Sequence, residues 1–241
     1  MLKRIKLYGI DAPLMIFSYL IIGLGALMFA IFSEDYSGKV WTVGWGALLL
    51  FGGIVALHTS LFGKSKIWEK ILATHGINSD ATVLDMGTGH GLVLIKIARI
   101  LGQDGHIKGI DLWKKQDQFD NSAKQLEQNI QDAQIVCEVS VDTGDIQALP
   151  YADQQFDLIT CSFVMHNIKG SDERTKAFVE ANRVLKKDGT LILVDTEHKS
   201  REYQHTLESL GFEVTTKSEG INGWWTGPWM GSYSMIAKKD K

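Results

Sequence analysis

A strand followed at once by a glycine-rich turn is the feature of this sequence that most limits its possible folds. Residues 82–85 read as a buried strand that ends in Asp85, and the turn at 87–91 contains three glycines. An apolar run over 92–101 then stops at Gly102, as a helix does. This order predicts a strand, a turn and a crossover helix of an α/β fold, with backbone N–H groups at the turn available to a ligand.

The residues around the turn indicate which ligand it binds. A dinucleotide fingerprint requires a third glycine where this chain has Leu92. The Asp85 carboxylate would repel a pyrophosphate and attract a positive charge or an amino group. A second strand over 106–110 ends in Asp111, a position from which a carboxylate accepts hydrogen bonds from a ribose. A ribose with a cationic substituent therefore fits better than NAD, and a nicotinamide-dependent oxidoreductase is disfavoured.

Five motifs in a fixed order resemble those of the class I S-adenosylmethionine-dependent methyltransferases of the small-molecule or lipid type. They lie at 85–91, 109–111, 144–151, 156–162 with 165–168, and 181–190. The one departure is Lys187-Asp188 in place of the usual Lys-Pro, at an expected surface turn. The resemblance covers about 67–241 and implies a Rossmann-like, doubly wound sheet of seven mostly parallel strands, the last of them antiparallel.

The resemblance also implies S-adenosyl-L-methionine as the cofactor, bound outside the carboxyl ends of the strands. It assigns Asp85 and Gly87 to the amino acid end of the cofactor, Asp111 to the ribose, and Asp145 with Ile146 to the adenine. The expected cofactor-binding residues are Asp85, Gly87, Thr88, Gly89, Gly91, Asp111, Leu112, Asp145, Ile146, Cys161 and Ser162. Asp111 and Asp145 could instead be a helix cap or a turn residue. No metal site is expected, because the two cysteines make no ligand spacing.

Two residues at the ends of later strands are the candidates for catalysis. Methyl transfer from a sulfonium depends mainly on alignment of donor and nucleophile, so a base is needed only if the nucleophile arrives protonated. His166 follows the fourth strand and is the candidate base, and Asp195 ends the fifth strand and could orient the substrate. A histidine bonded within its own turn and a solvated turn aspartate are the alternatives.

Two apolar runs precede this domain and predict a transmembrane hairpin. Residues 14–32 and 40–62 contain no Asp, Glu, Lys or Arg, and each run is long enough to cross a bilayer. Buried helices of a soluble protein are disfavoured because the runs have no polar face, and a cleaved signal peptide because a second run follows. The expected division is a membrane anchor over 1–64 and a methyltransferase domain over 65–241.

Basic residues at the ends of the hairpin predict its orientation. Lys3, Arg4, Lys6, Lys64 and Lys66 share one side, against only Lys39 in the acidic turn on the other. Both ends should therefore face the cytoplasm, and an integral protein of a bacterial cell membrane with a cytoplasmic catalytic domain is expected. A short helix over 65–75 should begin at Ser65 as its cap, with Trp68 either an interfacial anchor or packed under the first strand. Glycines in the second span would allow close helix contact within the hairpin or in a homodimer.

A tryptophan-rich loop over 220–231 indicates the kind of acceptor. Three tryptophans and a methionine between glycines would make a mobile apolar surface, or a loop packed on the last strands. With the hairpin, this surface favours a small lipophilic acceptor in the bilayer, such as an isoprenoid quinone precursor. A methyltransferase for apolar thiols or xenobiotics and a cofactor-binding scaffold without turnover are the alternatives. A net charge of −3 and the absence of a long basic block disfavour nucleic acid as a partner.

Overall fold

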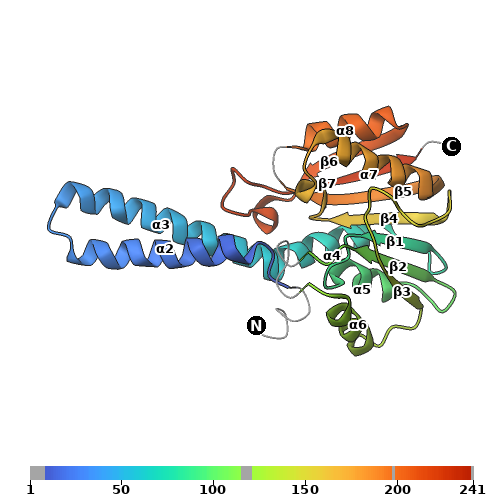
Figure 1. The fold of residues 1–241 in the computed structure, drawn as a ribbon, viewed down its shortest axis with the longest axis horizontal. Helices are drawn as coiled ribbons and strands as arrows, with labels where there is room; N and C mark the ends of the chain where they lie inside the picture. The colour runs from blue at the N-terminus through green and yellow to red at the C-terminus, as the bar shows by residue number, and fades with distance from the viewer. Residues whose placement is uncertain (1–8, 115–120, 197–198, 240–241) are drawn as a thin grey trace.

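The computed structural model describes residues 9–114, 121–196 and 199–239, and it consists of a sheet domain from which a two-helix arm projects (Figure 1). Three basic residues used in the orientation argument, Lys3, Arg4 and Lys6, lie outside the described residues.

One seven-stranded sheet forms the centre of the domain, as the sequence predicts. Its strands are β1 (Thr82–Met86), β2 (His106–Asp111), β3 (Glu138–Thr143), β4 (Phe156–Ser162), β5 (Leu185–Asp195), β6 (Phe212–Ser218) and β7 (Tyr233–Lys239). The order is β3-β2-β1-β4-β5-β7-β6, and the paired strands are parallel except that β7 runs antiparallel to both β5 and β6. The strand order reverses between β1 and β4, which is where a ligand binds in an open α/β sheet.

Helices cover both faces of this sheet and give it two hydrophobic cores. Side chains of α7 (Ser171–Val184) and α8 (Ser200–Ser209) pack on one face, and those of α4 (Lys64–His75) and α5 (Leu92–Ala98) on the other. Along β1 the side chains alternate between the faces: Leu84 belongs to the first core and Val83 to the second, and both are fully buried. Further along the chain, α6 (Ala123–Asp132) begins at Ser122, whose hydroxyl accepts a hydrogen bond from the Gln125 N–H.

The arm is a hairpin of two apolar helices, α2 (Pro13–Phe32) and α3 (Tyr36–His58). Only Ile16, Gly23 and Ala30 of α2 are buried, and sixteen large apolar side chains of the described residues of the two helices are exposed. Asp35 ends the connecting turn and accepts hydrogen bonds from the backbone N–H groups of residues 37 and 38, which starts α3. Both helices are long and apolar enough to cross a bilayer.

Glycines bring the two helices of the arm together. A Cβ on Gly23 would lie 2.9 Å from the Gly46 carbonyl oxygen, and one on Gly53 would lie 2.8 Å from the Leu20 side chain. A Cβ on Gly44, by contrast, would meet nothing within 4 Å. Gly23 and Gly53 therefore allow close contact between the two helices of the hairpin. The homodimer stays a prediction.

The second helix of the arm continues into the sheet domain without a loop. A π-helical turn, η1 (Thr59–Gly63), joins α3 to α4, and the Lys64 N–H donates to the Thr59 carbonyl across this wider turn. Ser65 is consequently inside a helix and not its cap, and its hydroxyl instead donates to Glu69. The expected boundary at residue 64 thus falls within a continuous helix.

Trp68 packs inside the domain and is not an interfacial anchor. Its side chain is fully buried in the core between α4, α5 and the sheet, and its indole N–H donates to the Ser162 hydroxyl over 2.8 Å. The alternative interpretation, packing under the sheet, is therefore correct.

Candidate functional site

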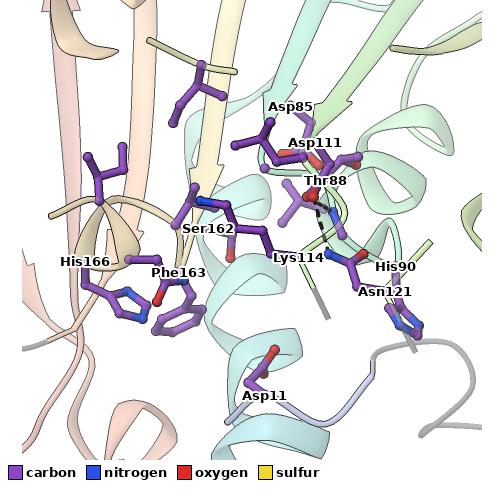
Figure 2. Close-up of a pocket in the computed structure, with 18 of the residues that line it drawn as sticks. Asp11, Asp85, Thr88, His90, Asp111, Lys114, Asn121, Ser162, Phe163 and His166 are labelled. Atoms are coloured by element: carbon purple, nitrogen blue, oxygen red, sulfur yellow. Dashed lines mark hydrogen bonds between the residues drawn. The ribbon is translucent and has the colours of Figure 1, made fainter. Parts of the chain in front are cut away.

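A cavity of about 710 Å³ opens at the carboxyl ends of β1, β2 and β4. Its wall includes most of the residues that the sequence predicts for the site: Asp85, Gly87, Thr88, Gly89, Asp111, Leu112, Asp145, Ile146, Ser162 and His166. In Figure 2, Asp85, Thr88 and Asp111 lie toward one end of the cavity, with His166 and Phe163 toward the other.

The glycine-rich turn is held against the end of β2 by hydrogen bonds. The N–H groups of Gly87 and Thr88 donate to the Ile110 carbonyl over 2.8 and 3.2 Å, and the Gly89 N–H donates to Asp111 Oδ2 over 2.9 Å. Gly87 has a φ of +70°, and a Cβ there would lie 2.2 Å from the Val164 side chain. Only glycine therefore allows the turn to pass this close to the segment after β4.

Asp111 and Asn121 form a polar pair at the nucleoside end of the cavity. Asp111 Oδ1 accepts hydrogen bonds from the Trp113 N–H over 2.6 Å and from Asn121 Nδ2 over 3.3 Å. Among the described residues, the buried Oδ1 atom of Asn121 accepts no hydrogen bond. A buried acceptor of this kind calls for a donor from a ligand, and the hydroxyls of a ribose or the amino group of an adenine supply one. The residues present therefore fit the adenosine part of the expected cofactor.

Asp85 is a buried carboxyl at the end of β1, where burial disfavours its ionised form. Burial raises the pKa of its carboxyl to about 6, although Thr160 donates a hydrogen bond to Oδ1 over 2.7 Å and opposes the shift. Asp111 adds a smaller like-charge contribution to the same rise in pKa. A positively charged ligand beside Asp85 would favour the ionised form, so this end of the cavity suits an ammonium group or a sulfonium.

Asp145 lines the cavity and also organises its own turn. Its carboxylate accepts a hydrogen bond from the Gln147 N–H over 3.0 Å and others from the Gln147 side chain over 3.2 Å. This is the turn geometry weighed as the alternative to cofactor binding. The turn keeps Asp145 and Ile146 in the cavity wall, so the two interpretations are compatible here.

His166 and Asp195 form a tightly bonded pair at the other end of the cavity. His166 lies in η2 (Met165–Asn167), and its Nδ1 is 2.6 Å from Asp195 Oδ1. Asp195 is fully buried, does not line the cavity, and also accepts hydrogen bonds from the N–H groups of His166 and Thr196. A carboxylate only accepts, so Nδ1 carries a proton and Nε2 is the basic nitrogen of the neutral ring. Asp195 therefore positions His166 and does not orient the substrate directly.

Two expected cofactor residues, Gly91 and Cys161, are not among the described residues that line the cavity. Gly91 precedes α5 at a φ of +85°, and a Cβ there would lie 2.4 Å from the Leu126 side chain. Cys161 is 1% exposed on β4, and burial together with nearby Asp195 and Asp85 holds the pKa of its thiol well above the usual range. Gly91 thus packs the turn closely against Leu126, and the buried Cys161 side chain belongs to the core.

The base of the hairpin also contributes to the cavity, which the sequence does not predict. Asp11 precedes α2 and Lys64 follows η1, and both line the cavity with the residues above. Phe163 lines it too, at a φ of +57°, a conformation rare for aromatic residues. The Phe163 ring packs edge-on against Trp225 with 5.2 Å between ring centroids.

Trp225 joins the tryptophan-rich loop to the hairpin. It belongs to a hydrophobic cluster with Ile10, Ile16, Ala56 and Leu61, against which Phe163 and Met230 also pack. Its indole N–H donates to the Ser232 hydroxyl over 3.1 Å. The loop is thus packed on the hairpin base and not only on the last strands, although Trp229 and Ile221 remain more than half exposed.

Comparison with known proteins finds similarity to methyltransferases within the sheet domain. Residues 84–193 match the family model described as a methyltransferase domain. The ubiquinone/menaquinone biosynthesis C-methyltransferase of Yersinia enterocolitica is 29% identical over 66% of this chain and 63% of its own length. The demethylmenaquinone methyltransferase of Lactobacillus johnsonii is 31% identical over 66% of this chain and 59% of its own length. The chain thus spans less than two thirds of either relative.

Solved structures share the fold at lower sequence identity. A SAM-dependent methyltransferase from Aquifex aeolicus superposes with a TM-score of 0.55 at 21% identity, over 71% of this chain and 88% of its own. The [4+2]-cyclase SpnF superposes with a TM-score of 0.59 at 18% identity, over 73% of this chain and 80% of its own. The fold therefore does not by itself fix the reaction. The family match shows a methyltransferase domain over residues 84–193, and the fold of the sheet domain agrees with it.

Proposed function

We propose that this protein is a membrane-anchored methyltransferase that transfers a methyl group from S-adenosylmethionine to a small lipophilic acceptor. The observation that carries the proposal is the composition of the cavity wall. One end is lined by Asp85, Asp111 and the glycine-rich turn, and the other by His166, Phe163 and residues of the hairpin base. A substrate that leaves a bilayer along the hairpin would arrive beside the acceptor end.

The chain's own residues would hold the cofactor through contacts of three kinds. Asp85 would accept hydrogen bonds from its ammonium group, Asp111 with Asn121 would bind its ribose, and the turn of Asp145 would border its adenine. When bound, the cofactor supplies an electrophilic methyl group on a positively charged sulfur.

His166 would act as a general base and remove a proton from the acceptor. This frees the electron pair that attacks the methyl group. Nε2 accepts the proton of an acceptor hydroxyl, while the buried Asp195 carboxylate stabilises the resulting imidazolium. The acceptor's electron pair then forms the bond to the methyl carbon as the carbon–sulfur bond breaks. For methylation at a ring carbon, the C–H proton leaves afterwards, the ring recovers its aromaticity, and His166 returns its proton to the oxygen. The overall change replaces one acceptor hydrogen by methyl and releases one proton.

The names of two relatives suggest the class of acceptor. One is named for ubiquinone and menaquinone biosynthesis and the other for demethylmenaquinone. A reduced quinone precursor has ionisable hydroxyls on an apolar ring, which suits His166 beside the apolar side chains of Phe163, Val164 and Ile168. We therefore propose carbon methylation of such a ring, with apolar thiols or xenobiotics as the alternative acceptors.

The membrane part of the proposal rests on the exposed hairpin. An arm of this length with sixteen exposed large apolar side chains would aggregate in water, whereas a bilayer would cover them. Both ends of the arm lie on the side of the sheet domain, and the arm extends away from it (Figure 1). The basic flanks in the sequence support a cytoplasmic position for this side.

Activity is tested with the full chain purified in detergent and reconstituted into nanodiscs. The substrate is a demethylmenaquinol with a short isoprenyl tail, kept reduced, and the readouts are S-adenosylmethionine binding by calorimetry and methylated product by mass spectrometry. Binding with product formation supports the proposal. If the protein binds S-adenosylmethionine but methylates only water-soluble thiols, the alternative acceptor class is favoured over the quinol. If it binds S-adenosylmethionine and forms no product, a cofactor-binding scaffold is favoured. No binding would refute the cofactor assignment.

Membrane anchoring is tested separately with charge substitutions. Ile21 and Leu24 are exposed apolar residues in the middle of α2, and Val179 is an exposed apolar residue on α7 of the sheet domain. Ile21→Lys with Leu24→Lys should release the protein from membranes on alkaline washing, because each buried lysine costs roughly 3 kcal/mol in a bilayer. The control Val179→Lys should remain in the membrane fraction. Wild-type protein in the wash supernatant would refute anchoring.

A further inference from the structure

A buried ion pair lies at the base of the hairpin, and both of its residues line the cavity. Lys64 Nζ lies 2.6 Å from Asp11 Oδ2, and the side chains are only 4% and 17% exposed. The Ser60 hydroxyl donates to the same carboxylate over 3.1 Å and accepts a hydrogen bond from the Asp11 N–H over 2.9 Å. These contacts fix the start of α2 to the π-helical turn, with both charged groups in the cavity wall.

The position of this pair is difficult to explain by stability alone. Taking two charges out of water costs about as much as their attraction returns, and well-packed apolar residues usually do as well. Two other lysines that line the cavity, Lys114 and Lys169, are exposed, so Lys64 is the one lining lysine of the described part whose side chain is buried. A buried ammonium at a ligand cavity acts most strongly on negative charge that appears there, because little water screens it.

The same region contains the apolar surface that a ring would contact. Phe163 lies between His166 and Asp11 in the view of Figure 2, and its ring is held by Trp225. An acceptor ring against Phe163 would therefore have a base toward one side and the ion pair of the hairpin base toward another.

We propose that Lys64 is a specificity-determining residue of the acceptor site, where its ammonium stabilises the oxyanion of an acceptor with an ionising ring hydroxyl. The inference rests on the proposed methyltransferase function and specifies its acceptor. His166 takes one hydroxyl proton, the electron pair left on oxygen is delocalised into the ring, and Lys64 lowers the free energy of this anion before the methyl group is transferred. The membrane hairpin thus supplies part of the substrate site.

The experiment compares Lys64→Met with Lys66→Met. Lys66 lies two residues further along the same helix, is exposed, and does not line the cavity, so the control makes the same change of charge and shape outside the site. The probe is 4-nitrophenol, whose ionisation changes its visible absorbance, titrated onto the full chain in detergent with S-adenosylhomocysteine present. Calorimetric binding of S-adenosylmethionine confirms that each variant is folded.

The wild type and Lys66→Met should lower the pKa of the bound nitrophenol by about 1 or more, as an opposite charge nearby does. Lys64→Met should abolish this shift and reduce kcat/KM for the quinol roughly 10- to 100-fold, while Lys64→Arg restores much of both. Equal probe pKa values on the wild type and on Lys64→Met, or failure of the wild type to bind the probe, would overturn the inference.

A second variant guards against loss of folding. Removing Lys64 alone leaves Asp11 buried without this partner, so Lys64→Met combined with Asp11→Asn removes both charges. If the single variant does not bind cofactor, the double variant is measured in its place, with the same expected and contrary outcomes. Failure of the wild type to bind S-adenosylmethionine would refute the proposed function, whereas an unchanged probe pKa with intact cofactor binding refutes only the role of Lys64.

Discussion

Cofactor binding should depend on the protonation of Asp85. Burial raises the pKa of this carboxyl to about 6, so at pH 7 it is mostly ionised and at pH 5 mostly protonated. The cofactor's ammonium group stays positively charged over this range and would prefer the ionised form. Binding at pH 5 must therefore first remove a proton from Asp85.

The size of this effect follows from the pKa. About one molecule in ten carries protonated Asp85 at pH 7 and about nine in ten at pH 5, so the Kd should rise roughly tenfold on acidification, a loss of about 1.4 kcal/mol. The assay is calorimetric titration with S-adenosylmethionine at half-unit steps between pH 5 and 7. Asp85→Asn should bind roughly 10- to 100-fold more weakly at pH 7 and show no such pH dependence. A Kd of the wild type that is constant from pH 5 to 7, or an equal pH dependence in the variant, would refute the reasoning.

The same carboxyl should make the ligand-free protein less stable as the pH rises. A pKa that is higher in the folded than in the unfolded state contributes stability at pH values below about 4, and this contribution is lost as the pH rises through about 6. Between pH 4.5 and 7.5 the wild type should lose about 2 kcal/mol relative to Asp85→Asn. Thermal unfolding of the two proteins in the same detergent measures this difference, and parallel curves would contradict it.

Three further substitutions test the rest of the site. His166→Gln should lower kcat for the quinol by roughly 100-fold or more, while the Kd of S-adenosylmethionine stays the same. Stopped-time assays measure kcat, and calorimetry measures the Kd. Wild-type turnover of the variant would exclude His166 as a base. Gly63→Ala should lower the unfolding temperature, because its Cβ would lie 2.0 Å from the Asn222 carbonyl oxygen. The control Gly44→Ala meets nothing within 4 Å and should be neutral or slightly stabilising. Equal effects of the two substitutions would contradict this and show that η1 can move away. Trp68→Phe should cost roughly 1 kcal/mol in denaturant unfolding, since the indole hydrogen bond to the cavity hydroxyl is lost while the ring's packing is largely kept; an unchanged midpoint would contradict this.

The sequence predicts those parts of the site that are determined by short stretches of chain, namely the strand ends and the glycine-rich turn. Asp85 and Asp111 lie at the ends of neighbouring parallel strands, and parallel strands bring their carboxyl ends to one edge of the sheet. Glycine turns and strand ends are therefore sufficient to locate the cofactor end of the cavity. Cys161 also lies near a strand end, but its side chain is buried in the core, and the position of a residue along a strand does not show to which face its side chain points.

The residues that the hairpin base and Asn121 contribute to the cavity could not be predicted in this way. Asp11 and Lys64 are 53 residues apart in sequence and meet only because the hairpin returns the chain to its starting point. Asn121 belongs to none of the five motifs, so nothing local marks it. The sequence Gly63-Lys64-Ser65 reads as a break and a cap, yet the helix continues, since Gly63 is needed for the close approach to Asn222 and not for a turn. The sequence leaves both interpretations of Trp68 open for a related reason: a position beside a long apolar run is compatible with an interfacial anchor and with the core of the adjoining domain.

Because no loop separates the arm from the sheet domain, the orientation in which the cavity can meet a substrate in a membrane is restricted. A catalytic domain on a flexible tether samples many heights and angles above a surface, and its effective concentration toward a membrane substrate is an average over all of them. Here the helix from Ser37 to His75 is about 58 Å long, roughly twice the thickness of a hydrocarbon core. A tilt of the arm would therefore turn the cavity through the same angle. Because hydrophobic mismatch changes the tilt of spanning helices, the turnover of such an enzyme is expected to vary with the acyl-chain length of the surrounding lipid.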